Sequence, residues 1–157
     1  MTSIHPAVRV GHIHLRVADL ERSIAFYRDG LGFNVIADGR QLGLDAAFLA
    51  AGDYHHHIGL NTWESAGGEP PPPGHTGLYH VAFVYPDRQE LSAAIRRLLD
   101  HGYEIDHGTD HAATVSVYLE DPDGNGVELY YDRPREAWFD DDGRPILQAE
   151  RIPIESI

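Results

Sequence analysis

Histidine is the residue type in this sequence that most strongly suggests chemistry. The chain has 157 residues, of which 11 are His and none is Cys. Imidazole nitrogens bind divalent metals and exchange protons near neutral pH, so histidine serves both coordination and acid–base catalysis. The absence of cysteine excludes thiolate chemistry and a disulfide framework. Any metal site must therefore combine His with Asp or Glu.

Two of these histidines open similar segments. His12 and His80 each begin an apolar alternation, and an Asp follows seven residues later, at Asp19 and Asp87. A helical period comes after each Asp, which is a good N-cap, and glycines come after each helical stretch. Short strands are expected at 34–36, 47–49 and 58–60 after the first helix, and at 104–105, 114–119 and 127–131 after the second. The sequence thus predicts two copies of a strand–helix–three-strand unit.

This repeat predicts how the chain is organised. We expect a first βαβββ module at 8–66, a Pro/Gly-rich linker at 67–76, a second module at 77–133 and an acidic tail at 134–157. A module of roughly 60 residues buries a core poorly by itself, so the two sheets should pack together. The expected fold is α+β, with two βαβββ modules forming a cupped mixed β-sheet and the helices outside. The tail should wrap around this chain or a partner.

Side chains alternate between the two faces of a strand, which predicts what the cupped surface holds. The apolar alternation assigns one face of each strand to the helices and leaves the ionisable residues on the other. If the sheets face each other, four such side chains converge: His12, His57, His80 and Glu128. A single histidine on a strand is usually solvated, and Glu128 or Tyr118 alone would be an ordinary strand residue. Agreement of four positions in parity favours a divalent metal site with two His and one carboxylate, the pattern of non-haem Fe(II) oxygenases.

Charge and hydropathy exclude several classes of function. The formal net charge of −13 repels nucleic-acid phosphates and anionic membrane surfaces. No apolar run approaches the roughly 20 residues of a membrane helix, and the first residues lack the basic and apolar regions of a signal peptide. We expect a cytoplasmic protein that binds neither nucleic acid nor membrane, with a homodimer as the expected assembly.

Longer motifs resemble a known superfamily. The segments 12–33 and 121–130 look like the opening and the closing strand of the vicinal oxygen chelate superfamily, which includes glyoxalase I, fosfomycin and bleomycin resistance proteins and extradiol dioxygenases. The resemblance covers about 8–135. Within it, the motif from Thr109 to Glu128 and the His-rich run 55–60 are most similar to the catechol 2,3-dioxygenase branch. Enzymes of that branch typically have four such units, whereas this chain has two and would correspond to the metal-bearing domain.

The resemblance implies roles for particular residues. In that family, residues at the positions of His12, His80 and Glu128 hold iron, the residue at His57 is the acid/base, and those at His111 and Tyr118 are hydrogen-bond donors. The implied function is Fe(II)-dependent ring cleavage of a small catecholic aromatic by O2, with Mn, Zn or Ni as other possible metals. Strand parity adds His14, His55 and Arg16 as substrate-binding residues, and Arg16 suits a substrate carboxylate.

Two other functions stay open. In a glyoxalase-like isomerase or lyase, His57 would be a fourth ligand of Zn or Ni, and the metal would stabilise an enediolate. In a bleomycin-resistance-type binding protein, the cleft would sequester a drug without chemistry. Coordination of His57 separates the isomerase from the oxygenase, and retention of His12, His80 and Glu128 argues against the binding protein.

Overall fold

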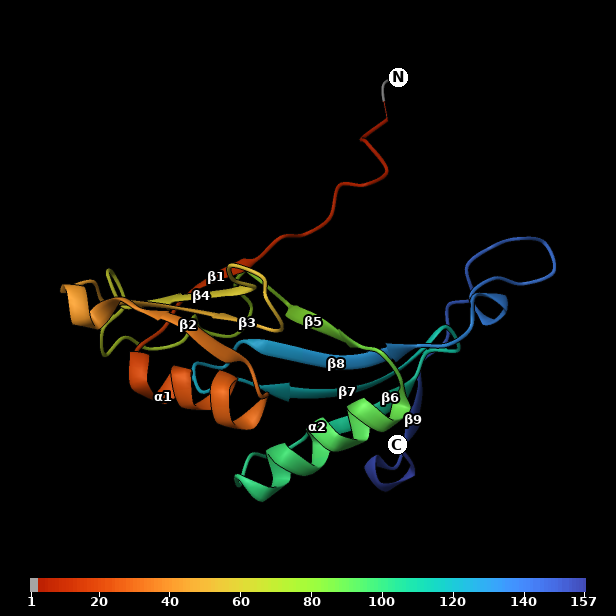
Figure 1. Ribbon diagram of the computed structural model, residues 1–157. Helices are drawn as coiled ribbons and strands as arrows, with labels where there is room; N and C mark the ends of the chain where they lie inside the picture. The colour runs from red at the N-terminus through yellow and green to blue at the C-terminus, as the bar shows by residue number, and fades with distance from the viewer. Residues whose placement is uncertain (1–2) are drawn as a thin grey trace.

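The computed structural model describes residues 3–157, which form two β-sheets and two main helices (Figure 1). The elements of the first part are β1 (Ile13–Arg16), α1 (Leu20–Ala25) with a π-helical continuation (Phe26–Gly30), β2 (Asn34–Asp38), a 3-10 turn (Gly39–Leu42), β3 (Ala46–Ala50) and β4 (Ile58–Asn61). The second part contains β5 (His80–Tyr85), α2 (Arg88–Asp100), β6 (His107–Asp110), β7 (Thr114–Glu120), β8 (Gly126–Asp132), a 3-10 turn (Arg135–Ala137), β9 (Glu150–Ile152) and a 3-10 turn (Ile154–Ser156).

The two sheets repeat one strand order. The first is ordered β1-β4-β3-β2 and the second β5-β8-β7-β6-β9. In each, the strand before the helix pairs in parallel with the last strand of the unit, and the remaining pairs are antiparallel. Figure 1 shows α1 and α2 on the same side of the sheets. The expected α+β fold with mixed sheets and outer helices is confirmed, and β1 and β5 each form an edge of their own sheet.

Both helices begin where their sequences predict. The Asp19 side chain accepts a hydrogen bond from the backbone N–H of Arg22 at 3.0 Å, and Asp87 does the same for Glu90 at 3.0 Å. These bonds satisfy N–H groups that the first turn of a helix leaves without partners. No helix within residues 3–157 has the length and apolar content that crossing a membrane requires.

One expected strand lies elsewhere. The segment 104–105 is irregular, and the strand of this region is β6, which begins at His107. Tyr103 and Ile105 are half-buried against the core, so their apolar spacing reflects packing of a connection rather than a ladder of hydrogen bonds. The expectation of a strand at 104–105 is therefore wrong. The tail contributes β9, which pairs with β6 through Gly108 and its neighbours.

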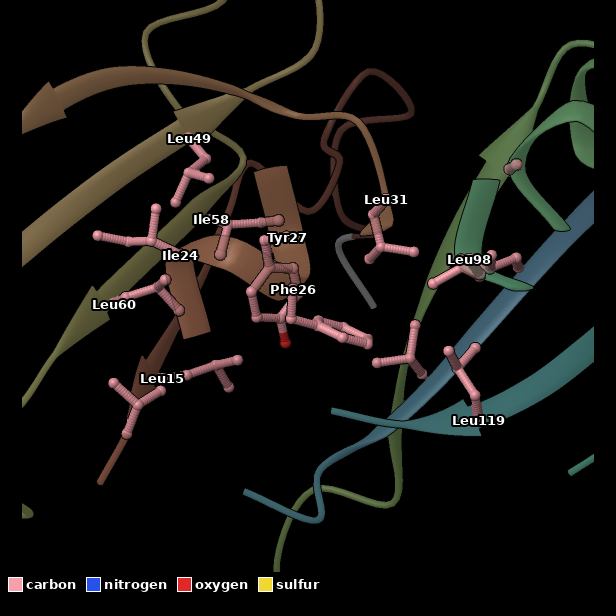
Figure 2. Packing of buried hydrophobic residues seen from close by; sticks show 14 of the residues in the cluster. Leu15, Ile24, Phe26, Tyr27, Leu31, Leu49, Ile58, Leu60, Leu98 and Leu119 are labelled. Carbon is pink, nitrogen blue, oxygen red and sulfur yellow. The ribbon is translucent and has the colours of Figure 1, made fainter. Parts of the chain in front are cut away.

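A single hydrophobic cluster joins the two halves of the chain (Figure 2). It contains residues from α1, from the first sheet, from α2 and from β7 and β8. Its members include Leu15, Ile24, Phe26, Tyr27, Leu49, Ile58, Leu60, Leu98 and Leu119. Most of these side chains are fully shielded from solvent. Because burial of apolar area is the main stabilising contribution, the two βαβββ units hold each other in place.

A polar turn of the second unit fastens helix α1 of the first. Asp121 accepts a hydrogen bond from the Tyr27 hydroxyl at 2.9 Å, and Asp123 accepts from the Arg22 guanidinium at 2.6 Å and the Ser23 hydroxyl at 3.1 Å. Burial, together with the nearby Asp121 carboxylate, raises the pKa of Tyr27 well above its usual value. The phenol therefore stays protonated and remains a donor.

Candidate active site

His80 and Glu128 form the centre of the candidate site. They lie on the neighbouring parallel strands β5 and β8. Ala82 of β5 is the register partner of Glu128, and His80 lies two residues before Ala82, on the same face of β5. His80 Nε2 is 3.0 Å from Glu128 Oε2. Both side chains are largely buried, with 31% and 12% of their surface exposed. The duplicated fold thus brings together two of the predicted metal ligands.

The second carboxylate oxygen of Glu128 is held from strand β7. The Ser116 and Tyr118 hydroxyls donate to Oε1 at 2.6 Å and 2.9 Å. Tyr118 is the register partner of Glu128, and Ser116 lies on the same face of β7. Burial, followed by the hydrogen bond and the charge of Glu128, raises the pKa of Tyr118 to about 12. Tyr118 is therefore a protonated donor at neutral pH, and the unshared electron pairs of Oε2 face His80.

His111 extends this network outward. Its Nε2 is 2.8 Å from the Tyr118 hydroxyl, and its Nδ1 is 2.9 Å from the Gln148 carbonyl oxygen. Hydrogen-bonding contacts therefore run from His80 through Glu128 and Tyr118 to His111. The four site residues predicted for the second module, His80, His111, Tyr118 and Glu128, are thus in one connected group.

Histidines of the first sheet form a separate cluster. The His12 ring lies 4.5 Å from the His56 ring between centroids, and His56 Nδ1 is 2.8 Å from His55 Nδ1. Burial, and then the neighbouring histidines with His12 foremost, lower the pKa of His56 below its usual value. The ring of His56 is therefore neutral at neutral pH. Its proximity to His12 does not follow from strand parity, because His56 precedes β4 in an irregular segment.

The backbone fixes His57 between two strands. Its N–H donates to the Leu49 carbonyl at 2.8 Å and its own carbonyl accepts from Ile13 at 3.0 Å. On the ring, Nδ1 accepts from the Ala51 N–H at 3.3 Å. Since Nδ1 is the acceptor, the neutral ring carries its hydrogen on Nε2.

His14 is oriented by a buried amide. The Trp63 N–H donates to Asn61 Oδ1 at 3.2 Å, which places the amide nitrogen toward His14 Nε2 at 3.0 Å. Asn61 therefore donates to His14, whose neutral ring carries its hydrogen on Nδ1. The ring of His14 also lies against Trp63 and Phe48. Of the other predicted substrate contacts, His55 bonds His56, and Arg16 pairs with Glu64 at 3.4 Å in an exposed ion pair.

A cleft of about 540 Å³ separates the edges of the two sheets. His12 and His57 line it from the first sheet, Ala82 and Val84 from β5, and much of the remaining lining is apolar. His12 thus lines one wall of the cleft, and β5, the strand that carries His80, lines the other. Across residues 3–157 the side chains form no group of three His, Asp or Glu close enough to hold an ion. Of the three predicted ligands, His80 and Glu128 are thus in contact, and His12 lines the cleft.

The donor pair fits a metal ion. At metal–ligand distances of about 2.1 Å, two donors at right angles around an ion are about 3.0 Å apart. His80 Nε2 and Glu128 Oε2 have this separation, and the other carboxylate oxygen, Oε1, is engaged by two hydroxyl donors. An imidazole with a hydrogen-bonded carboxylate also matches the donor preference of Fe, Mn and Zn.

Sequence reasoning missed four contributors: Ser116, Asn61, His56 and the carbonyl of Gln148. Ser116 shares its strand face with Tyr118, so strand parity was a sufficient signal for it. Asn61 is a buried polar residue at the end of β4, on the face of His57, and that parity was a weaker signal. Nothing in the local sequence pairs His56 with His12 or Gln148 with His111, because those contacts depend on the path of irregular segments.

Gly59 makes room for the imidazole of His14, so a mutation at Gly59 tests the placement of that ring. A Cβ built at Gly59 would lie 2.9 Å from His14 Cγ, against a buried strand. We expect Gly59→Ala to displace the His14 ring and to lower the free energy of unfolding by about 1–3 kcal/mol, as overpacking does. Urea unfolding measures this loss. Gly77→Ala is the matched control, since a Cβ there meets nothing within 4 Å. Equal stability of both variants would contradict the placement of His14.

Comparisons with known proteins show which family and which relatives the chain is similar to. The family model described as the Glyoxalase/Bleomycin resistance protein/Dioxygenase superfamily matches residues 9–129. A catechol-2,3-dioxygenase of Bacillus subtilis is 40% identical over all of this chain and 53% of its own length. A biphenyl-2,3-diol 1,2-dioxygenase of Rhodococcus globerulus is 32% identical over 79% of this chain and 63% of its own. The chain therefore spans about half to two thirds of the length of these relatives.

A solved structure matches the fold as well. The crystal structure of a glyoxalase/dioxygenase from Nostoc punctiforme superposes with a TM-score of 0.64 at 25% identity. The match covers 85% of this chain and 99% of that one. Both sheets and both helices of the repeat therefore belong to a known architecture.

Proposed function

Because the chain belongs to the Glyoxalase/Bleomycin resistance protein/Dioxygenase superfamily, we propose that it is a metal-dependent extradiol dioxygenase acting on a small catecholic aromatic. The observation that carries the proposal is the state of Glu128. One of its oxygens is held by two hydroxyl donors, and the other lies 3.0 Å from His80 Nε2. The names of the Bacillus and Rhodococcus relatives support the same class of reaction.

His80, Glu128 and His12 are the proposed ligands, and Fe(II) is the proposed metal, with Mn, Zn or Ni as alternatives. When bound, Fe(II) supplies the electron transfer that lets a catechol react with O2, and it lowers the pKa of the catechol hydroxyls. His12 lines the cleft opposite β5, the strand of His80. An ion bound by His12, His80 and Glu128 together therefore requires the two walls of the cleft to approach each other. Three protein ligands leave about three positions for the reactants on an octahedral ion.

The chain's other residues orient the substrate and move protons. His57 lines the cleft, and an imidazole side chain suits both the uptake and the return of a proton. The neutral ring donates from Nε2, and proton uptake occurs at Nδ1 once the 3.3 Å contact with Ala51 opens. Tyr118 stays a phenol and keeps donating to Glu128 Oε1, so it orients the carboxylate rather than acting as a base.

The cleft fits a single-ring aromatic. Its volume of about 540 Å³ is within the range of small-molecule sites, and Phe33 and Phe83 contribute apolar surface to it. Substrate contacts with His14, Arg16 and His55 remain proposals. The Arg16 side chain is 70% exposed and pairs with the exposed Glu64, so it is accessible to a substrate carboxylate.

Oxygen consumption tests the proposal. The chain is purified anaerobically, loaded with Fe(II), and assayed for O2 uptake and ring-cleavage products with a panel of catechols. We expect uptake with at least one substituted catechol and none with the metal-free chain. Absence of uptake by fully loaded protein across a broad panel would overturn the dioxygenase assignment.

His57→Gln tests the acid–base role. We expect kcat to fall about 10²–10⁴-fold, the range typical for loss of a general acid–base group, with the iron content unchanged. Steady-state kinetics and metal analysis measure both quantities. His75→Gln, a change in the exposed linker, is the control and should leave both unchanged. An unchanged kcat in the His57 variant would contradict the role.

The glyoxalase-like isomerase is the second candidate, and one observation favours it. His12 and His57 line the same cleft, which supports a role for His57 as a further ligand beside His12. In that case His57→Gln would lose metal as well as activity, and Zn or Ni would support turnover. Metal content of this variant therefore separates the two functions.

A further inference from the structure

Arg97 is a cation that lines the cleft without an anionic partner. It lies in the last turn of α2 and is half-buried. Within residues 3–157 its guanidinium donates to the Leu31 carbonyl, at 3.1 Å from Nη1, and no carboxylate of these residues forms an ion pair with it. A guanidinium presents several N–H donors in a rigid fork, so most of this fork remains available to a ligand.

The turn after α1 holds the guanidinium of Arg97 against the wall of the cleft. The Leu31 carbonyl lies at the end of the helical segment, where carbonyl groups lack intrahelical partners, and Arg97 supplies the missing donor. The next residue, Gly32, has φ of 87°, and a Cβ built on it would lie 2.5 Å from Arg97 Nη1. The close backbone on one side and the hydrogen bond on the other therefore fix the guanidinium in place.

The cleft extends from the histidine side of the sheets to the helix side. Strand alternation places Ala82 of β5 on the face of His80, and Tyr85 on the opposite face, which packs toward the core and α2. Ala82 and Tyr85 both line the cleft, as do His12 and Arg97. A ligand that fills the cleft therefore meets imidazole on one side and guanidinium on the other.

Tyr85 adds a hydroxyl donor to the side of the cleft that holds Arg97. Burial raises the pKa of Tyr85 above its usual value, although the nearby charge of Arg97 acts in the opposite direction. The phenol therefore carries a hydrogen to donate at neutral pH. Phe33 and Phe83, with ring centroids 5.1 Å apart, supply apolar surface to the same cleft. Beside such surface an unpaired guanidinium is costly, and a ligand carboxylate offsets the cost by accepting parallel N–H bonds.

We propose that Arg97 and Tyr85 form a carboxylate site, and that the cleft binds an aromatic acid with its carboxylate there and its ring toward the histidines. Arg97 lines the cleft, whereas the exposed Arg16 pairs with Glu64 away from it. Identifying the acid as a catechol with a short carboxylate side chain rests on the proposed function. The carboxylate site itself is a property of the chain alone.

Titration calorimetry with hydrocinnamate, a phenyl ring with a short alkyl carboxylate, tests the site in the metal-free chain. We expect Arg97→Met, which keeps a long side chain and loses the charge, to weaken binding about 10–100-fold, as loss of a hydrogen bond to a charged group does. Arg96→Met is the matched control, because Arg96 is exposed and lines a different groove, and its affinity should equal that of the parent chain. Absence of binding to the parent chain, unchanged affinity in Arg97→Met, or an equal loss in both variants would overturn the proposal.

Two further ligands and one further variant make the test specific. The uncharged hydrocinnamamide should bind the parent chain and Arg97→Met equally, and acetate should bind the parent more weakly than hydrocinnamate, because the apolar lining acts only on the ring. Acetate binding as tight as that of hydrocinnamate would overturn the proposal. If Arg97→Met does not fold, Tyr85→Phe decides, since it removes only the hydroxyl. Weaker hydrocinnamate binding there, by about 10-fold, supports the proposal, and unchanged binding refutes it.

Turnover gives the second readout. In iron-loaded protein we expect Arg97→Met to raise KM for dihydrocaffeate, the catechol with the same side chain, about 10–100-fold, with kcat little changed. KM for unsubstituted catechol should stay the same. Lack of O2 uptake by the parent chain with every catechol would count against the dioxygenase, and calorimetry would still decide the carboxylate site. In an active parent, an unchanged KM for dihydrocaffeate would refute the assignment of the substrate class.

Discussion

Glu128→Gln should purify without stoichiometric iron. The amide keeps the shape of the carboxylate but loses its charge, and its nitrogen is a donor where an ion needs an electron pair. Ser116 and Tyr118 both donate to this position, so the amide oxygen will face them and the amide nitrogen will face His80. We expect iron affinity to fall by more than about 100-fold, beyond the effect of losing an outer partner.

Metal analysis after anaerobic loading and titration calorimetry with Fe(II) measure this loss. Glu120→Gln is the matched control, because Glu120 lies exposed at the end of β7 and should retain iron. Circular dichroism of both variants checks that the fold is kept. Iron content equal to that of the parent chain would remove Glu128 from the ligand set and, with it, the proposed site.

Asp121→Ala should cause the largest loss of stability among the changes considered. The carboxylate is 4% exposed and accepts from the Tyr27 hydroxyl and from the backbone N–H groups of Asp123 and Asn125. Removing it leaves several buried donors without partners, each at about 1–3 kcal/mol. We expect the free energy of unfolding to fall by about 3–5 kcal/mol, with the Tyr27 end contributing because it joins the two units.

Urea unfolding followed by circular dichroism measures the loss. Tyr27→Phe removes only one of these hydrogen bonds and should cost about 1–2 kcal/mol. Asp141→Ala, in the exposed acidic run 140–142 after β8, should change stability little. A loss below about 1 kcal/mol in Asp121→Ala would show that the turn does not fasten helix α1.

Local patterns predicted most of the fold. The spacing from His12 to Asp19 and from His80 to Asp87 identified the repeat, and both aspartates cap helices as expected. The strand at 104–105 was wrong because apolar alternation reports burial, and burial also occurs in a connection such as Tyr103–Ile105. Periodicity does not encode which segments pair, so β9 and its partner β6 were beyond its reach.

The candidate site was predictable to the extent that strand parity determines it. Parity placed Tyr118 and Glu128 on one face, and the structure puts their hydroxyl and carboxylate 2.9 Å apart. The distance between His12 and that group depends on how the edges β1 and β5 approach, and no local signal specifies this. The ligand set therefore stays a prediction, as do the substrate contacts of His14, Arg16 and His55.

The common core has a consequence for dissection of the chain into its two halves. Phe26 and Tyr27 of the first half and Leu98 and Leu119 of the second are buried in one cluster, whereas the four prolines between the halves are exposed. The exposed linker therefore contributes little to holding the halves together, whereas the shared core contributes most of it. A substitution in the core of either half is therefore felt by the other, so we expect neither half to fold when it is produced alone.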